Sequence, residues 1–219
     1  MKKLIVACLG SILVVAAHAA DNPLYETGPA QDSSFVRFLN ASEDKASVVN
    51  GAAKVALAAQ GDARVSRFYP VKAGAKLAAN VQVGTAKTAV EVVAKPGEFV
   101  TVAIISKGTG IETVIIKDTP TDFNASRSSV ALLNLDASCA VAGLNVAVKN
   151  TPILEAVKPA TLQRRLVNPI SLKAQAMCDA KEEGKGVDLG QLQAGERYSV
   201  VVMPGKKGRQ TFFVRDSTS

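Results

Sequence analysis

The amino-acid sequence repeats one order of strands and turns, and this repeat limits the fold more than any single motif. Each copy opens with an apolar run that ends in Asn, and it closes with a Gly-Glu turn, a strand and a hairpin. The matching pairs are residues 34–40 with 128–134, 95–105 with 193–203, and 110–118 with 208–216. Because the pairs occur in the same order, the sequence predicts two equivalent domains, with a small insertion in the second.

The residues within each copy favour strands over helices. The chain has no Trp and is rich in Val and Ala, and short apolar runs alternate with turn signals such as Val49-Asn50-Gly51 and Met203-Pro204-Gly205. We therefore predict an all-β chain of two tandem small antiparallel β-sandwich domains of Ig-like type. A helix is the alternative for the Ala-rich residues 52–59.

The boundary between the two domains is expected where the composition becomes polar. Pro120 cannot continue a central strand, and the residues after it are mostly polar. The prediction is an N-terminal sandwich over residues 20–119, a linker over 120–126 and a C-terminal sandwich over 127–219.

The first residues have the pattern of a cleaved signal peptide. Lys2 and Lys3 precede an apolar run over residues 4–17, and small residues lead up to Ala19. We expect residues 1–19 to be removed and the mature chain to lie in the periplasm. A membrane anchor is the alternative, but the run is shorter than the roughly 20 residues that span a bilayer. Lipid attachment at Cys8 is disfavoured because the apolar run continues well beyond that residue.

Two cysteines remain in the mature chain, Cys139 and Cys178. In an oxidising compartment a single pair of cysteines most simply forms a disulfide, which closes a loop of about forty residues and contributes roughly 4 kcal/mol. Two buried free thiols are the alternative. The sequence therefore predicts a bridge in the second domain.

The mature chain lacks the side chains of the common catalytic sets. The single histidine, His18, lies in the expected signal peptide, which excludes Ser-His-Asp and Cys-His catalysis and histidine-based metal sites. Carboxylates such as Glu43-Asp44 lie near turns, where solvation explains them better than a two-carboxylate hydrolase does. We predict that the chain is not an enzyme and has no cofactor or metal site.

Basic residues gather in the second half. The formal charge of +7 falls to about +5 without Lys2 and Lys3, and the cations include Lys158, Arg164, Arg165, Lys173, Lys206, Lys207, Arg209 and Arg215. An anionic polysaccharide or an acidic protein surface could use them, although solvation alone also explains such charges. Nucleic acid is not expected as a partner, because no aromatic stacking residues alternate with the cations.

The opening of the mature chain resembles a known family. Leu24-Tyr25, the spacer Gly28-Pro29 and residues 32–41 (DSSFVRFLNA) are similar to the start of the AlgF family of alginate O-acetylation proteins, and residues 68–74 (FYPVKAG) also agree. The resemblance is sharpest at residues 24–41. The second half departs from the family pattern at the cysteine pair and at residues 181–184.

The resemblance implies a function without catalysis. Members of the family are periplasmic adaptors that assist a membrane-bound acyltransferase and periplasmic SGNH-type acetyltransferases in acetylating an exopolysaccharide. Alginate is the first expectation for the polymer and acetylated cellulose the second. The alternatives from other classes are a secreted Ig-like binding or adhesion module of the cell envelope and, less favoured, a pilus-type chaperone.

Three residues near the start of the first domain are candidates for partner binding. Leu24 and Tyr25 lie in a Pro-flanked extended stretch, where they either pack against the first domain or contact a partner. Strand alternation places Arg37 on the face opposite Val36 and Phe38, where its guanidinium can reach a carboxylate.

Overall fold

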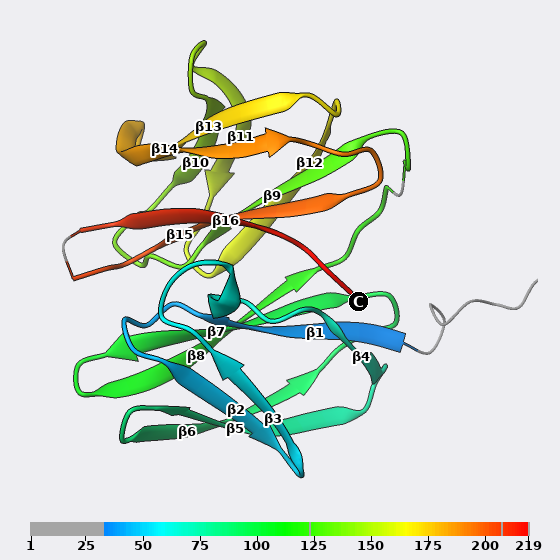
Figure 1. Ribbon diagram of the computed structural model, residues 1–219, viewed down its shortest axis with the longest axis vertical. Coiled ribbons are helices and arrows are strands. Elements are labelled where there is room, and N and C mark those ends of the chain that lie inside the picture. The colour runs from blue at the N-terminus through cyan, green and yellow to red at the C-terminus, as the bar shows by residue number, and fades with distance from the viewer. Residues whose placement is uncertain (1–32, 123, 207, 219) are drawn as a thin grey trace, which may run out of the picture.

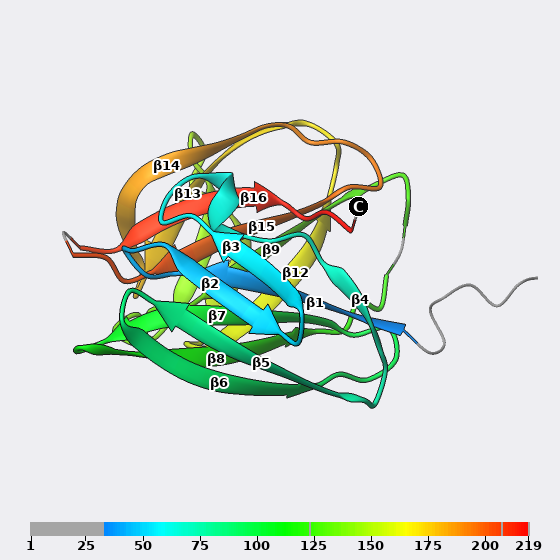
Figure 2. The same ribbon diagram turned by 60° about the horizontal axis from the view of Figure 1, so that its bottom comes forward.

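The chain forms two β-sandwich domains that stack on each other. The computed structural model describes residues 33–122, 124–206 and 208–218. These residues contain four sheets of four strands each. Figure 1 shows the sheets as four layers, two from each domain, and Figure 2 brings the outermost sheet of the N-terminal domain to the front.

Each domain contributes eight strands. The N-terminal domain contains β1 (Ser33–Asn40), β2 (Ala46–Asn50), β3 (Ala53–Leu57), the 3-10 helix η1 (Asp62–Arg64), β4 (Tyr69–Lys72), β5 (Lys76–Val83), β6 (Ala86–Val93), β7 (Phe99–Lys107) and β8 (Gly110–Asp118). The C-terminal domain contains β9 (Ser128–Asn134), β10 (Ala142–Val146), β11 (Thr151–Val157), β12 (Thr161–Val167), β13 (Ser171–Cys178), β14 (Lys181–Gln191), β15 (Arg197–Met203) and β16 (Gln210–Arg215). The predicted all-β class with two sandwiches is confirmed, and the Ala-rich residues 52–59 contain a strand, not a helix.

The two domains have the same topology. Sheet β4-β1-β7-β8 covers sheet β3-β2-β5-β6, and sheet β12-β9-β15-β16 covers sheet β11-β10-β13-β14. The sandwiches are not purely antiparallel. Strands β1 and β7 pair in parallel, and so do β9 and β15. In each copy the chain crosses to the other sheet and returns beside its first strand in the same direction, as parallel pairing requires.

The sequence repeat corresponds to a repeat of strand register. Val36 of β1 pairs with Val100 of β7, and at the matching positions Val130 of β9 pairs with Tyr198 of β15. The extra residues of the second copy lie partly in β14, which has 11 residues against 8 in β6. This agrees with the insertion expected in the second domain.

The Asn that ends the first strand of each copy has one structural role in both. Asn40 Nδ2 donates hydrogen bonds to the carbonyls of Asp44 and Ala58 at 2.8 and 2.9 Å. Asn134 Nδ2 makes the corresponding bonds in the C-terminal domain at 2.9 and 3.1 Å, to carbonyls in the loop after β9 and at the end of β11. Both side chains are buried, and their amides tie a loop to the third strand of the domain.

Three hydrophobic clusters hold the molecule together, one inside each sandwich and one between the domains. Along β1, Val36 and Phe38 face the N-terminal core, whereas Leu39 faces the interdomain cluster. Strand β9 repeats this alternation and places Leu133 between the domains. Because the central strands of both facing sheets are buried on two sides, their sequences are nearly unbroken apolar runs.

The interdomain cluster is formed by equivalent positions of the two copies. Leu39, Ala103 and Ile105 lie on the N-terminal side, and their counterparts Leu133, Val201 and Met203 lie on the C-terminal side. Each domain thus contacts the other through the same face of the same sheet, as two subunits do in a two-fold dimer. The two sandwiches therefore form a single packed unit.

The connection between the third and fourth strands differs between the copies. Residues 58–68, which include η1, join β3 to β4, whereas residues 158–160 join β11 to β12. In the C-terminal domain Arg165 Nη1 on β12 donates to the carbonyl of Ile153 on β11 at 3.2 Å. The two edge strands of that sandwich are therefore linked to each other.

The predicted disulfide is confirmed. Cys139 and Cys178 are bonded, with 5.5 Å between their Cα atoms, and they connect the loop after β9 to the end of β13. Strand pairing places Val83 of the N-terminal domain at the position of Cys178, since each is opposite the first residue of the second strand in its copy. The bridge thus belongs to the C-terminal copy alone.

Candidate functional site

A buried arginine connects the two domains. Arg37 of β1 is 1% exposed, and its Nη1 lies 2.6 Å from Asp216 Oδ1 at the end of the C-terminal domain. Its Nη2 donates to Ser199 Oγ at 3.0 Å and its Nε to Thr101 Oγ1 at 2.9 Å. The guanidinium also lies 4.5 Å from the ring centroid of Phe68. Charge, hydrogen bonds and stacking together satisfy this buried cation.

Three further charged side chains extend this contact to the surface. Arg164 Nη2 lies 3.1 Å from Asp216 Oδ2, and Arg164 Nε lies 2.7 Å from Asp118 Oδ2. Arg197 Nη2 completes the chain of ion pairs at 2.9 Å from Asp118 Oδ2. We refer to Arg37, Asp216, Arg164, Asp118 and Arg197 as the Arg-Asp network. With three cations and two anions it carries one positive charge in excess.

Burial and neighbouring charge act in opposite directions on Asp216. Its burial disfavours the ionised form, but the charges of Arg37 and Arg164 and the hydrogen bond from Ser199 outweigh this effect and lower the pKa of the carboxyl group. Burial, followed by repulsion from Arg164, lowers the pKa of Arg197 to about 10. Both groups are therefore ionised at neutral pH.

The sequence contained a signal for part of this network. Asp118 and Asp216 are the matching last residues of GIETVIIKD and GRQTFFVRD, a repeat that by itself predicts only a shared hairpin. Their pairing with arginines from the opposite domain depends on how the two sandwiches face each other, which strand patterns do not specify.

A polar groove lies beside the network, at the junction of the two domains. It has a volume of about 590 Å³, and its walls come from β8, the interdomain segment, β9 and β12. The lining residues are Lys117, Asp118, Thr119, Pro120, Thr121, Asp122, Ser129, Leu162, Arg164, Arg165 and Leu166. Both domains therefore contribute to one surface, and any ligand that fills it contacts both.

The donors around this groove suit an acidic ligand. A smaller pocket of about 120 Å³ shares Asp122, Ser129 and Leu166 with it and is also lined by Arg127 and Arg197. Among the described residues, the Nε atoms of Arg127 and Arg197 are buried and have no hydrogen-bond partner. Buried donors of this kind can be satisfied by carboxylate oxygens.

The described residues offer few of the groups that commonly bind metals. They include no group of three or more His, Cys, Asp or Glu side chains that could hold a metal ion, and both of their cysteines are in the disulfide. His18 lies outside the residues described here. No helix within residues 33–122, 124–206 and 208–218 is long and apolar enough to cross a membrane. The groove can bind and orient a ligand through charge and hydrogen bonds.

The predicted site residues have different outcomes. Arg37 does lie opposite Val36 and Phe38, but its guanidinium is not exposed as expected, because it is buried against Asp216 of the same chain. Leu24 and Tyr25 lie outside the described residues.

Several cations of the second half are paired within the chain. Arg209 lies 2.6 Å from both Asp136 Oδ2 and Glu183 Oε1, and Arg215 pairs with Glu196. Burial disfavours the ionised form of Asp136, but hydrogen bonds from Ser138 and the charge of Arg209 lower its pKa. The basic character of this domain is thus partly neutralised.

Comparison with solved structures gives only distant similarity. The C-terminal domain of AlgF from P. aeruginosa is 21% identical, covering 41% of this chain and 98% of that domain, with a TM-score of 0.35. The Bacillus anthracis TIE protein is 8% identical, covering 85% of this chain and 44% of that protein, with a TM-score of 0.25. A search of curated proteins gave no match.

Comparison with protein families is more informative. The model of the family described as alginate O-acetyl transferase AlgF matches residues 7–199. This range covers most of the chain and includes strands of both sandwiches and the whole Arg-Asp network except Asp216. The chain therefore belongs to the AlgF family, whose function lies in alginate O-acetylation.

Proposed function

We propose that this chain is a non-catalytic periplasmic adaptor that links a membrane-bound acyltransferase to periplasmic SGNH-type acetyltransferases while alginate is O-acetylated. The observation that carries the proposal is the Arg-Asp network, with the apolar cluster beside it. Together they join the two sandwiches through a buried contact, so that the surfaces of both domains keep a fixed relation. An adaptor needs such a relation to hold two partners at a constant distance.

The junction groove is the proposed contact for one acetyltransferase partner. It combines surfaces of both domains with an excess positive charge, and the smaller pocket beside it contains the donors that lack acceptors. An acidic loop of a partner would fit these features, and only the assembled two-domain unit would bind it. Lys117 and Arg165 are the cations at its rim that lie outside the Arg-Asp network.

Deletion of the gene tests the biological part of the proposal. The acetyl content of the secreted alginate should fall to background while the amount of polymer stays nearly unchanged, because an adaptor acts on acetyl transfer and not on polymerisation. Unchanged acetyl content would contradict the proposal. Acetyl transfer by the purified chain alone would contradict its non-catalytic part.

Charge reversal at the groove rim tests the contact. In the double variant Lys117→Glu/Arg165→Glu, co-purification with the SGNH-type acetyltransferase should fall about tenfold or more, since like charges across an interface repel. Lys87→Glu on β6 is the control, because Lys87 is exposed on the outermost sheet of the N-terminal domain. Equal binding by both variants, with unchanged circular dichroism, would exclude the groove as the contact.

A further inference from the structure

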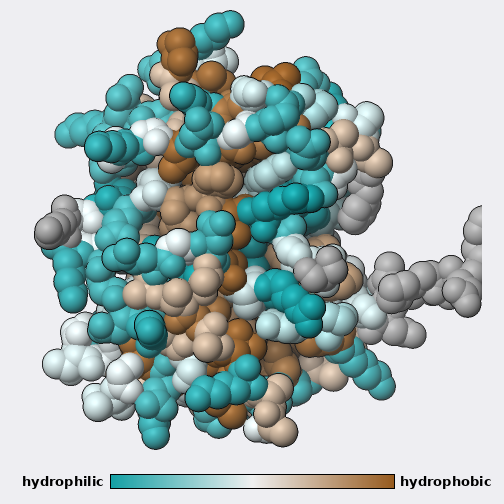
Figure 3. Space-filling view, in the orientation of Figure 1, coloured by the Kyte–Doolittle hydropathy of each residue, from teal (hydrophilic) through white to brown (hydrophobic). Residues whose placement is uncertain are grey.

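An apolar groove of about 300 Å³ opens at one edge of the N-terminal sandwich, between β3 and β4. Val36, Phe38 and Val48 form its floor, and these side chains are buried. Four apolar side chains around them are only partly buried, namely Val55, Tyr69, Val71 and Leu77. Hydrophobic surface reaches the outside in the lower half of Figure 3, the part of the view that contains this domain.

The matching edge of the C-terminal sandwich is closed. Leu154 and Leu172, which correspond to Val55 and Leu77, are 6% and 4% exposed. The short connection from β11 to β12 and the hydrogen bond of Arg165 hold that edge together. Among the described residues, β3 and β4 share no hydrogen bond. The groove is therefore a property of one copy and not of the fold.

The strands that line the groove carry an excess of positive charge. They contain no Asp or Glu and have three exposed cations, Lys54, Lys72 and Lys76, of which Lys76 is paired at 2.9 Å with Glu91 of the neighbouring strand β6. The residues directly before β1 have the opposite composition. Residues 21–32 contain no Lys or Arg, and their acidic side chains are Asp21, Glu26 and Asp32.

We infer that the groove binds residues 21–32 of this same chain, with Leu24 and Tyr25 on its apolar floor. The segment lies outside the described residues, so the inference rests on the groove, the charges and the length of the connecting chain. Ser33 pairs with Lys72 of β4, which places the groove wall within a few residues of the start of β1. Tyr25 precedes Ser33 by eight residues, which span up to about 26 Å when extended.

The sequence between Tyr25 and β1 allows the chain to turn back. Gly28-Pro29 is a dipeptide that favours a turn. A short tether also gives the segment an effective concentration on the order of millimolar at the groove, so weak contacts suffice to keep the groove occupied. This inference does not depend on the proposed adaptor function.

A tryptophan introduced at position 25 tests the inference directly. The chain has no natural Trp, so Tyr25→Trp gives one reporter in protein expressed with its own N-terminus and purified after export. The expected result is blue-shifted emission and an acrylamide quenching constant several-fold smaller than that of free N-acetyltryptophanamide. Quenching equal to that of the free compound would overturn the inference.

Second-site variants show whether the protection comes from this groove. Val55→Asp should restore full quenching, and Lys54→Glu, at an exposed position that tolerates substitution, should raise the quenching constant about twofold because it reverses an attractive charge. Lys87→Glu is the matched control and should leave it unchanged. Protection from quenching that survives both Val55→Asp and Lys54→Glu in folded protein would overturn the inference. Protection that appears only as the protein concentration rises would also overturn it, because a second copy would then supply the segment.

Discussion

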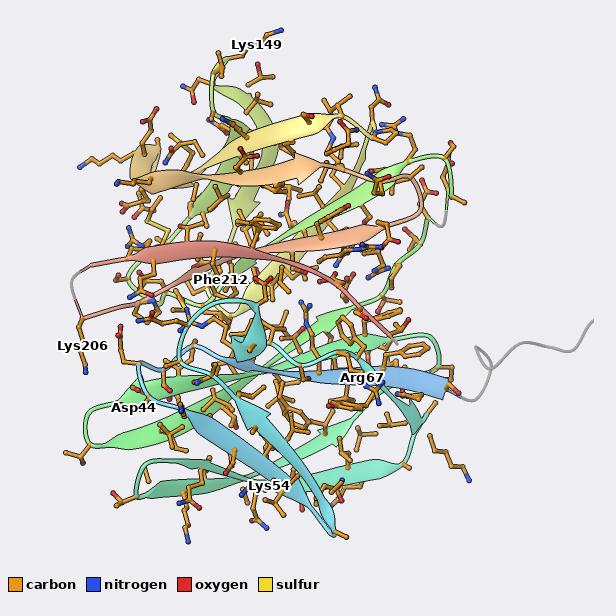
Figure 4. The ribbon with its side chains drawn as sticks, in the orientation of Figure 1. Asp44, Lys54, Arg67, Lys149, Lys206 and Phe212 are labelled. Atoms are coloured by element: carbon orange, nitrogen blue, oxygen red, sulfur yellow. A yellow bond between two sulfur atoms is a disulfide. The ribbon has the colours of Figure 1, made fainter. Side chains whose placement is uncertain are left out.

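The two domains have the same strands in the same register but close their third-to-fourth edge in different ways. In the C-terminal copy a short connection and two cross-strand hydrogen bonds, from Arg165 to Ile153 and from Gln163 to Ala156, close this edge. In the N-terminal copy the longer connection leaves that edge and reaches the other domain. Arg64 of this connection donates to the carbonyls of Asn40 and Ser42 in its own domain. Its guanidinium also lies 4.9 Å from the ring centroid of Phe212 in the C-terminal domain, a residue that Figure 4 shows at the boundary between the domains.

This difference shows that residues in equivalent positions of a repeat can stabilise different parts of a molecule. Residues of the N-terminal connection contact the C-terminal domain instead, as Arg64 does at Phe212 and as the Phe68 amide does at the carbonyl of Ser217. The N-terminal sandwich thus has an open apolar groove at this edge, and the connection that leaves the edge strengthens the contact between the two domains. Three experiments can break or sharpen this comparison.

The largest effect is expected from Arg37→Met. The substitution leaves Asp216 buried with one of its arginines missing, and it removes hydrogen-bond partners from Ser199 and Thr101, so the free energy of unfolding should fall by about 3–5 kcal/mol. Urea unfolding measures the loss. Arg37→Lys is the control, which keeps the charge without the planar donor group and should lose less. A loss below about 1 kcal/mol for Arg37→Met would mean that the apolar cluster alone holds the domains together.

A smaller effect is expected from removal of the disulfide. Cys139→Ser/Cys178→Ser should lower the free energy of unfolding by about 2–4 kcal/mol, because the bridge restricts the unfolded chain over a sequence separation of 39 residues. Amide exchange should become faster in β10 and β13 and stay unchanged in β2 and β5, which have no bridge. Equal acceleration in both domains would show that they open as one cooperative unit.

The smallest effect concerns acid and Asp216. Its pKa is lower in the folded protein than in the unfolded chain, so the stability it contributes is present above the unfolded value of about 3.9 and is lost as the pH falls through the folded value. One such group changes the free energy of unfolding by at most about 1.4 kcal/mol per pH unit. Asp216→Asn should be less stable at pH 7 but should show a shallower loss below pH 4. Equal slopes for the two proteins would indicate that other carboxylates dominate.

Much of the fold followed from patterns within single segments. The repeat predicted two like domains, turn residues and β-branched residues predicted strands, and the cysteine pair predicted the bridge between Cys139 and Cys178. The parallel pairing of β1 with β7 could not be predicted in this way, because it depends on which sheet the intervening strands join. The uninterrupted apolar residues of β9 indicated that both faces of the strand are buried. They did not indicate which surface of the protein covers the second face.

The candidate site was less predictable. Strand alternation placed Arg37 on the correct face, but its partner Asp216 lies 179 residues away in the sequence, and their contact exists only after the domains have packed. An arginine in a strand is usually exposed, and this general rule led to the expectation of a partner surface. The matching Asp residues that end each copy were the one available signal for a shared role.

The equivalent faces through which the domains meet have a consequence for how such a chain can diverge. In a dimer of identical subunits every substitution at the interface occurs twice, whereas in a tandem duplication each half changes alone. Arg37 stands in one copy where Ala131 stands in the other, so the buried ion pair of Arg37 with Asp216 has no counterpart from the second copy. An isolated pair of C-terminal domains would lack this cation and could not reproduce the contact. Because the two copies are covalently linked, an architecture with two-fold symmetry can contain a junction whose two sides differ.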